Sequence, residues 1–270
     1  MKLLTEALLK FTCGVVLVGL LLFWPAGTMA FPGGWLLMGL LFVPMVIAGF
    51  VMLFCSPALL KRRLDAKEKR SAQQGIIKLA GLMFIAGFVV AGLDFRFGWS
   101  RVPLWAMIGS AVLFLAGYGR WAEVTRENAY LSRAVEVQEG QKVISTGLYG
   151  VVRHPMYMAT LLMFLPMPLI LGSFWGLLPF ALYPFLIAVR ILNEEKVLTA
   201  GLAGYEAYKQ KVRYRLVPFL WEIGKKPPRL GFKYDFLTKR KAKRWKSFCA
   251  ARPSAVSRPP WGGISPNVCH

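Results

Sequence analysis

A basic and aromatic motif and an acidic pair stand at the two ends of one apolar stretch of the chain. The motif is Arg153-His154-Pro155-Met156-Tyr157, and the pair is Glu194-Glu195. Two apolar segments joined at Gly172-Ser173 lie between them, so a hairpin would bring both groups to the same end. Polar groups at membrane depth cost free energy unless they bind something. We therefore expect the two groups to form opposite walls of a pocket for a charged small molecule.

The composition predicts a membrane protein. Of 270 residues, 56% are apolar, which is too many for a soluble domain of this length. A net charge of +21 can indicate nucleic-acid binding. In a membrane protein, however, such an excess more often indicates cytoplasmic loops in contact with anionic lipid. We expect membrane lipids, and no nucleic acid, as partners. The four cysteines form no CxxC pair and only one of two histidines lies in the expected fold, so we expect no metal site.

Six apolar segments can be marked along the chain, and they run approximately over 8–24, 33–54, 76–94, 102–121, 156–172 and 174–192. We expect an all-α integral membrane protein in which the first four segments span the bilayer and the last two form a C-terminal helical hairpin. Basic residues crowd the connection 61–70, whereas 25–34 is uncharged. This asymmetry places 61–70 and both termini in the cytoplasm, and we expect the membrane to be a bacterial inner membrane.

The two hairpin segments look short and broken. Roughly 17 residues each would reach only ~25 Å of a ~30 Å hydrocarbon core. Prolines interrupt both arms, at Pro166, Pro168, Pro179 and Pro184. Broken helices are tolerated in membranes where they line an enclosed cavity, although a kinked hairpin that merely packs is the alternative. The charged groups at both ends favour a cavity.

Three regions follow from this pattern. Residues 1–121 hold the N-terminal helices, 122–221 the hairpin with its site, and 222–270 a basic tail rich in Pro, Ser and Gly. Within the second region, the alternation and glycines of 135–150 predict a short strand or extended loop ending in a turn, a cytosolic flap beside the membrane. The composition of the tail predicts disorder. It either lies on anionic lipid or has no role.

The order of motifs resembles the isoprenylcysteine carboxyl methyltransferase family and its phospholipid methyltransferase relatives. The resemblance covers about residues 118–221 and rests on Gly147-Leu148-Tyr149-Gly150, Arg153-His154-Pro155-Met156-Tyr157, the apolar hairpin, Glu194-Glu195, Tyr205-x-x-Tyr208 and the basic segment 212–218 that closes on proline. Two positions depart from the family pattern. Leu148 replaces a usual proline, and Ala159 replaces a usual glycine.

The resemblance implies a methyltransferase that uses S-adenosyl-L-methionine without a Rossmann fold, and the chain has no GxGxxG motif after a strand. Arginine can bind the carboxylate of this cofactor bidentately, glutamates can accept from its ammonium or ribose, and tyrosines can face its sulfonium. The expected cofactor-binding residues are Tyr149, Arg153, His154, Tyr157, Glu194, Glu195, Tyr205 and Tyr208.

The methyl acceptor is expected to be lipophilic and to enter from the bilayer. A carboxylate acceptor is already charged at pH 7 and needs an orienting cation, for which Arg190, Arg213 and Arg215 are candidates. The alternative is an N-methyltransferase of phosphatidylethanolamine-type headgroups. An amine acceptor of this kind must first lose a proton, so Glu127 or one of the paired glutamates would then act as base. The arginines after the hairpin favour the carboxylate. The oligomeric state is not predicted.

Two classes without methyl transfer stay open, a small transporter and a silent membrane scaffold. A transporter would be expected to show internal repeats and a charge in mid-span. The sequence shows its charges at the cytoplasmic ends instead.

Overall fold

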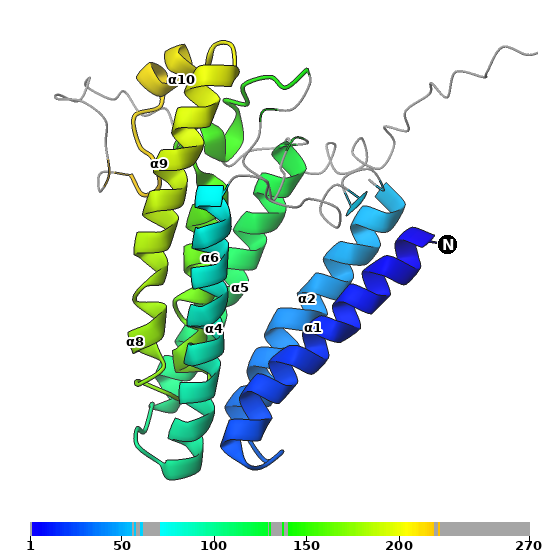
Figure 1. Ribbon diagram of the computed structural model, residues 1–270, viewed down its shortest axis with the longest axis vertical. Coiled ribbons are helices and arrows are strands. Elements are labelled where there is room, and N and C mark those ends of the chain that lie inside the picture. The colour runs from blue at the N-terminus through cyan, green and yellow to red at the C-terminus, as the bar shows by residue number, and fades with distance from the viewer. Residues whose placement is uncertain are drawn as a thin grey trace, which may run out of the picture. The chain divides into compact units, whose positions relative to one another are not determined.

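The computed structural model describes residues 2–55, 57, 60–61, 71–128, 130, 137, 140–218 and 221, and most of them are helical. The elements, most of which Figure 1 labels, are α1 (Lys2–Ala26), α2 (Pro32–Cys55), α4 (Ser71–Phe97), α5 (Leu104–Glu127), the 3-10 turn η1 (Gly147–Gly150), α6 (Pro155–Phe164), α7 (Met167–Ile170), α8 (Leu177–Phe180), α9 (Tyr183–Gly201) and α10 (Tyr205–Lys211). The predicted tail 222–270 and most of the basic connection 61–70 lie outside the described residues.

Four helical stretches are long and apolar enough to cross a membrane: Leu4–Ala26, Pro32–Cys55, Gln73–Phe97 and Leu177–Gly201. A helix can span hydrocarbon because it pairs its own backbone N–H and C=O groups while its apolar side chains face the lipid. The described part of the chain contains helices and no strand. The predicted all-α membrane fold is confirmed.

The assignment of two segments differs from the prediction. The segment 102–121 begins α5, which is not among the four stretches because Tyr118, Arg120 and Glu123 interrupt its apolar character. The second arm of the hairpin is longer than expected and runs from Leu177 to Gly201. The expectation of a short second arm is therefore wrong. The helix continues past residue 192 because Glu194, Glu195 and Lys196 are good helix formers.

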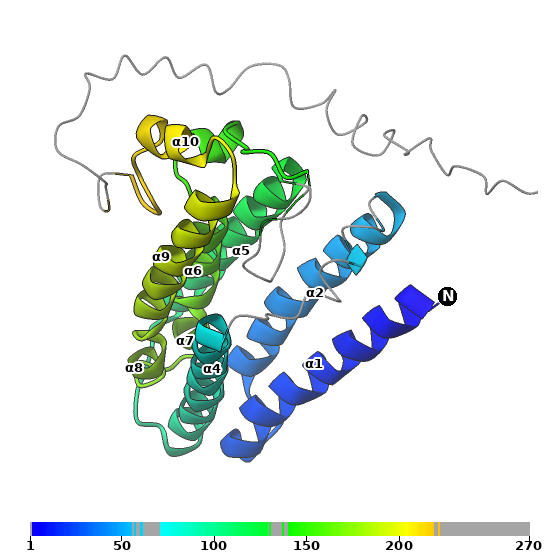
Figure 2. The same cartoon turned by 45° about the horizontal axis from the view of Figure 1, so that its top comes forward.

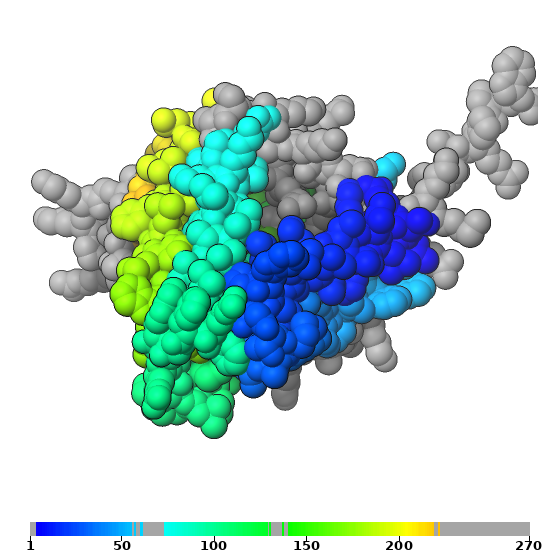
Figure 3. Space-filling view, turned by 60° about the horizontal axis from the view of Figure 1, so that its bottom comes forward, coloured from blue at the N-terminus to red at the C-terminus, as the bar shows by residue number. Residues whose placement is uncertain are grey.

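Helix α1 packs directly on α4. A Cβ added at Gly92 of α4 would lie 2.8 Å from the carbonyl oxygen of Leu22 in α1, so glycine permits this close approach. At the same end, the rings of Phe31 and Phe95 stack with centroids 4.3 Å apart. Figure 3, viewed from this end, shows α1 and its connection to α2 beside α4.

Helices α6 and α9 carry the predicted motifs and run side by side, with α5 against α6 and α4 against α9 (Figures 1 and 2). The α5–α6 contact is close, since a Cβ at Gly117 would lie 2.6 Å from Cγ of Met163 and 3.1 Å from the carbonyl oxygen of Ala159. Ala159, one of the two departures from the family pattern, is fully buried. Tight packing on α5 therefore fixes the position of α6.

The turn of the hairpin is held by a buried carboxylate. Gly172 has a φ of +79°, as the predicted tight turn requires. The adjacent Ser173 donates its hydroxyl to Asp94 near the end of α4. Asp94 also accepts from the Ser100 backbone N–H at 2.8 Å and from the Ser100 hydroxyl. These bonds tie the hairpin turn to the α4–α5 connection, at the end of the bundle opposite the Arg153 motif.

Candidate functional site

Two segments that are far apart in sequence pair where the Arg153 motif begins. Val152 forms a parallel β-bridge with Tyr214. The backbone N–H of Arg153 donates to the carbonyl oxygen of Tyr214 at 2.9 Å, and that of His154 donates to the carbonyl oxygen of Arg215 at 2.9 Å. Pro155 then occupies the first turn of α6, where its missing N–H costs nothing. The backbone of the motif is therefore fixed from both sides.

The side chain of Arg153 is completely buried and is bonded on two sides. Its Nε donates to Oε1 of Glu195 at 2.8 Å. Its Nη1 donates to the carbonyl oxygens of Val212 at 2.8 Å and Arg213 at 3.1 Å. A buried guanidinium is stable only when it is paired and hydrogen-bonded in this way. Arg153 thus joins the start of α6, α9 and the segment after α10.

Glu195 is the centre of a group that we call the Glu195 cluster: Arg153, His154, Glu195 and Arg215. Besides Arg153, the Glu195 carboxylate lies 3.3 Å from Nε2 of His154. Its second oxygen accepts from Nε of Arg215 at 3.0 Å. The guanidinium of Arg215 also lies over the ring of Trp221, 4.9 Å from its centroid. Two arginines therefore face one glutamate, which leaves an excess of positive charge suited to an anionic ligand group.

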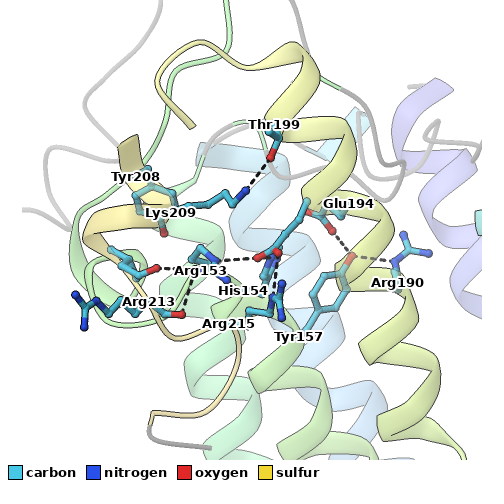
Figure 4. A network of polar contacts seen from close by, with 12 residues as sticks. Arg153, His154, Tyr157, Arg190, Glu194, Thr199, Tyr208, Lys209, Arg213 and Arg215 are labelled. Carbon is cyan, nitrogen blue, oxygen red and sulfur yellow. Dashed lines mark hydrogen bonds and ion pairs between the residues drawn. The ribbon is translucent and has the colours of Figure 1, made fainter. Parts of the chain in front are cut away.

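Glu194 belongs to a separate group, the Glu194 cluster, which consists of Tyr157, Arg190 and Glu194. The hydroxyl of Tyr157 donates to Oε2 of Glu194 at 2.5 Å and accepts from Nε of Arg190 at 2.9 Å. Figure 4 shows Tyr157 between the side chains of Arg190 and Glu194, with His154 nearby. The rings of His154 and Tyr157 are 5.8 Å apart, which places the two clusters next to each other.

The side chains of the two glutamates point in different directions because both residues lie within α9. The sequence had suggested that the pair follows the helix. Consecutive residues of an α-helix point about 100° apart, since a turn takes 3.6 residues. One carboxylate therefore faces the Arg153 motif while the other faces Tyr157. The predicted meeting of the basic-aromatic motif with the acidic pair is present, and it consists of two separate groups of contacts.

Tyr205 and Tyr208 of α10 cover the Glu195 cluster. Both side chains are buried, and their ring centroids are 5.8 Å apart. The Tyr208 hydroxyl donates to the carbonyl oxygen of Tyr149 at 2.7 Å, while the Tyr149 hydroxyl accepts from Nδ2 of Asn128 at 2.9 Å. Burial raises the pKa of Tyr205 and of Tyr208, and the Glu195 charge raises that of Tyr205 further. Both hydroxyls therefore stay protonated and remain donors at neutral pH.

Two buried polar atoms of this region have no hydrogen-bond partner among the described residues, Nη2 of Arg153 and the hydroxyl of Tyr205. A buried donor left unpaired costs about 1–3 kcal/mol, and more for a charged group. A bound molecule that presents acceptor atoms would remove this cost. The donors present therefore suit a ligand that carries acceptor groups such as a carboxylate or hydroxyls.

Glu127 and Arg213 take different positions from those that their expected roles suggest. An oxygen of Glu127 accepts from the backbone N–H of Leu148 at 3.3 Å. Gly147 has a φ of +55°, and a Cβ there would lie 1.8 Å from Oε1 of Glu127. Glu127 thus supports the η1 turn. Arg213 contributes its carbonyl oxygen to Arg153, and its guanidinium points away from Arg153 and His154 in Figure 4.

Arg215, a candidate orienting cation for the acceptor, donates from its Nε to Glu195. The structure also brings to the site groups that the sequence did not indicate. The backbone carbonyl oxygens of Val212 and Arg213 accept from Arg153, and no pattern of residue types in the sequence indicates such backbone contacts. Gln73 of α4 donates its Nε2 to the carbonyl oxygen of Arg190 at 3.5 Å. Among the described residues, no cluster of three or more potential metal ligands occurs.

Comparison with known families identifies the same region. The model of the phospholipid methyltransferase family matches residues 105–203, from the start of α5 to the end of α9. The matched segment contains the Arg153 motif and both glutamates, whereas Tyr205 and Tyr208 follow it. The resemblance drawn from the motifs is confirmed, since this family includes the isoprenylcysteine carboxyl methyltransferases. With the four apolar helices, the match supports an integral-membrane methyltransferase.

Proposed function

We propose, from the match of residues 105–203 to the phospholipid methyltransferase family, that the protein transfers a methyl group from S-adenosyl-L-methionine to the carboxylate of a lipid-like acceptor. One observation carries the proposal. The Glu195 cluster and the Glu194 cluster lie side by side, linked through His154 and Tyr157. Adjacent sites for two charged molecules are what a direct transfer between them requires.

The Glu195 cluster suits the cofactor. The unpaired Nη2 of Arg153 can bind the cofactor carboxylate, with the positive charge of Arg215 close by. The unpaired Tyr205 hydroxyl can donate to the ribose, and the ring of Tyr157 offers a face to the sulfonium. When bound, the cofactor supplies a methyl group on a positively charged sulfur.

The Glu194 cluster suits the acceptor. Its Arg190 guanidinium lies against Tyr157, with Nε 2.9 Å from the phenol oxygen and the guanidinium carbon 6.0 Å from the ring centroid. A guanidinium can hold a carboxylate in a fixed orientation beside the methyl donor. With both molecules bound, the carboxylate oxygen would bond to the methyl carbon as the carbon–sulfur bond breaks, and the electron pair of that bond would stay with sulfur. No proton moves, so the residues act by positioning and by excluding water.

Methylation of an amine headgroup is the second candidate, and one observation favours it. The Glu194 carboxylate lies beside Tyr157, in the position from which it could accept the proton that an ammonium must lose. In this case Arg190 would repel a cationic acceptor. The presence of that guanidinium is why we place the carboxylate first.

The site lies at the end of the helices that adjoins the basic connection 61–70, because Gln73 at the start of α4 contacts Arg190. We propose that this end faces the cytoplasm, where the cofactor is available, and that both termini lie on the same side of a bacterial inner membrane.

The test incubates purified protein in lipid nanodiscs with cofactor carrying a labelled methyl group and a lipid extract. Mild base releases labelled methanol from a methyl ester, whereas an N-methyl product keeps its label. The proposal predicts base-labile product. A base-stable product would favour the amine candidate, and the absence of any labelled lipid would favour a transporter or a scaffold.

A paired variant examines the acceptor site. Arg190→Gln should reduce kcat/KM for the acceptor by about 10- to 100-fold, the value of a charged hydrogen bond, and leave cofactor affinity nearly unchanged. Glu206→Gln is the control, because Glu206 is exposed and pairs with Lys209 on α10. Equal activity of the two variants would refute the role of Arg190.

A further inference from the structure

Glu127, a candidate base in the sequence, has no part in the proposed reaction. It is the last residue of α5, and Oε2 of its carboxylate accepts from the backbone N–H of Leu148 at 3.3 Å. A Cβ at Gly147 would lie 1.8 Å from Oε1, so the carboxylate packs directly on the backbone of η1. The conformation of the η1 turn therefore depends on a side chain from the end of α5.

Asn128, the C-cap of α5, holds the same turn by a second contact. Its Nδ2 donates to the hydroxyl of Tyr149 at 2.9 Å, and its Oδ1 accepts from the backbone N–H of Tyr130 at 3.0 Å. Two adjacent residues of α5 thus hold two adjacent residues of η1. A shift of the turn relative to α5 would break both contacts.

The backbone of η1 is also bonded to two segments of the proposed cofactor site. The carbonyl oxygen of Leu148 accepts from the backbone N–H of Val152 at 3.0 Å, and Val152 directly precedes Arg153. The carbonyl oxygen of Tyr149 accepts from the hydroxyl of Tyr208 in α10 at 2.7 Å. The η1 turn therefore connects the end of α5 with the start of α6 and with α10.

We propose that Glu127 and Asn128 are positioning residues for the cofactor, and that they act through η1 on Arg153 and on Tyr205 of α10. The inference rests on the proposed function, in which Nη2 of Arg153 and the Tyr205 hydroxyl bind S-adenosyl-L-methionine. Both donors are buried, so the surrounding backbone sets their positions, and a displaced turn misaligns them. Glu127 thus affects cofactor affinity without contacting the cofactor, and it takes no proton from the methyl acceptor.

The N–H of Leu148 allows the Glu127 contact to be removed from either side. Proline at this position has no N–H, so the carboxylate loses the donor that it holds there. The turn itself does not use this N–H, because its own bonds run from the N–H groups of Tyr149 and Val151. Leu148 also stands where the family pattern usually has proline, which indicates that such a turn accepts that residue.

Calorimetric titration of the purified full chain with S-adenosyl-L-methionine measures the effect as a double-mutant cycle. Glu127→Ala should weaken cofactor binding about tenfold, the order of one hydrogen bond to a charged group. In a Leu148→Pro background, the same change should weaken it less than about twofold. Glu123→Ala is the matched control one turn earlier on α5, where Glu123 pairs with Arg120 at 3.3 Å, and it should leave the affinity unchanged.

Glu127→Gln separates positioning from a role as base. Glutamine keeps a side-chain oxygen that accepts from Leu148, but it cannot take a proton at neutral pH. We expect a cofactor affinity within about threefold of the unmodified protein and an unchanged kcat for labelled cofactor with the lipid extract. A large loss of kcat at unchanged affinity would identify Glu127 as a base and overturn the inference.

Asn128→Ala provides the second test if Glu127→Ala does not fold, and it should weaken cofactor binding about threefold. Unchanged affinity in the folded Asn128→Ala and Glu127→Ala variants, even with a lower Tm, would show a purely structural role and overturn the inference. An equal effect of Glu127→Ala with Leu148 and with proline at that position would also overturn it. Absence of cofactor binding by the folded, unmodified protein would instead overturn the proposed function, and the inference with it.

Discussion

The replacement of Glu195 by glutamine, compared with the same change at Glu194, is the sharpest structural prediction. Glu195 contacts three cationic or ionisable groups, Nε of Arg153 at 2.8 Å, Nε of Arg215 at 3.0 Å and Nε2 of His154 at 3.3 Å. Glu194 accepts from the neutral hydroxyl of Tyr157. The same chemical change is made at two neighbouring positions. A difference in stability between the two variants therefore reports the difference between the contacts of Glu195 and those of Glu194.

The expected magnitude follows from the burial of Arg153. Removing one partner of a buried ion pair costs about 3–5 kcal/mol, because the other charge stays buried and uncompensated. The Arg153 side chain is 0% exposed and cannot turn to water, whereas that of Arg215 is 16% exposed and can. The carbonyl oxygens of Val212 and Arg213 continue to bind Arg153. We therefore expect the lower value, about 3 kcal/mol.

Thermal unfolding of the purified protein in detergent, followed by intrinsic fluorescence, provides the assay. At about 2–4 °C per kcal/mol for a chain of roughly this size, Glu195→Gln should lower Tm by about 6–12 °C. Glu194→Gln keeps an oxygen that accepts from Tyr157 and should lower Tm by less than about 2 °C. Equal Tm values for the two variants would refute the assignment of Glu195 to the buried pair.

Three further predictions follow from the same contacts. Tyr208→Phe should lower the free energy of unfolding by about 1 kcal/mol, because the hydrogen bond from the Tyr208 hydroxyl to Tyr149 is lost. The Tyr205 hydroxyl has no partner among the described residues, so Tyr205→Phe should leave Tm unchanged in the same thermal assay. Asp94→Ala should lower the free energy of unfolding by about 2 kcal/mol, because Ser100 and Ser173 lose their acceptor. Calorimetry should show unchanged cofactor affinity, because Asp94 lies at the end of the helix bundle opposite the proposed site, and a weaker affinity would contradict that separation. Burial raises the pKa of Tyr205 and of Tyr208 in the folded protein above the value of about 10 that a tyrosine has in an unfolded chain. The contribution of these two tyrosines to folding stability is therefore complete below about pH 10 and decreases as the pH rises further. Scans of Tm against pH should show a smaller alkaline fall in the double Phe variant, and an identical fall would contradict this cause.

The meeting of the two motifs could be predicted from the sequence because it depends on topology alone. A hairpin that crosses part of a membrane and returns must bring residues before and after it to the same end. The positions of Arg153, His154, Tyr157 and Glu195 follow from that constraint, and the side-chain contacts agree with it.

The division of the glutamates could not be predicted in the same way. It depends on α9 continuing through Asn193–Lys196, and a short apolar run does not show where a helix ends. The position of Glu127 depends on the absence of a side chain at Gly147, where a Cβ would lie 1.8 Å from Oε1 of the carboxylate. Gln73 lies 117 positions from Arg190, and no local pattern in α4 indicates their contact. These features arise from tertiary packing.

Calorimetric titration of the detergent-purified protein with S-adenosyl-L-methionine tests the central claim most directly, because it measures cofactor binding without any assumption about the acceptor. The two clusters predict one molecule bound per chain. They also predict weaker binding by His154→Ala and by Tyr205→Phe, and unchanged binding by the exposed control Glu206→Gln. Absence of binding by the folded protein, or equal affinity in all four proteins, would contradict the claim.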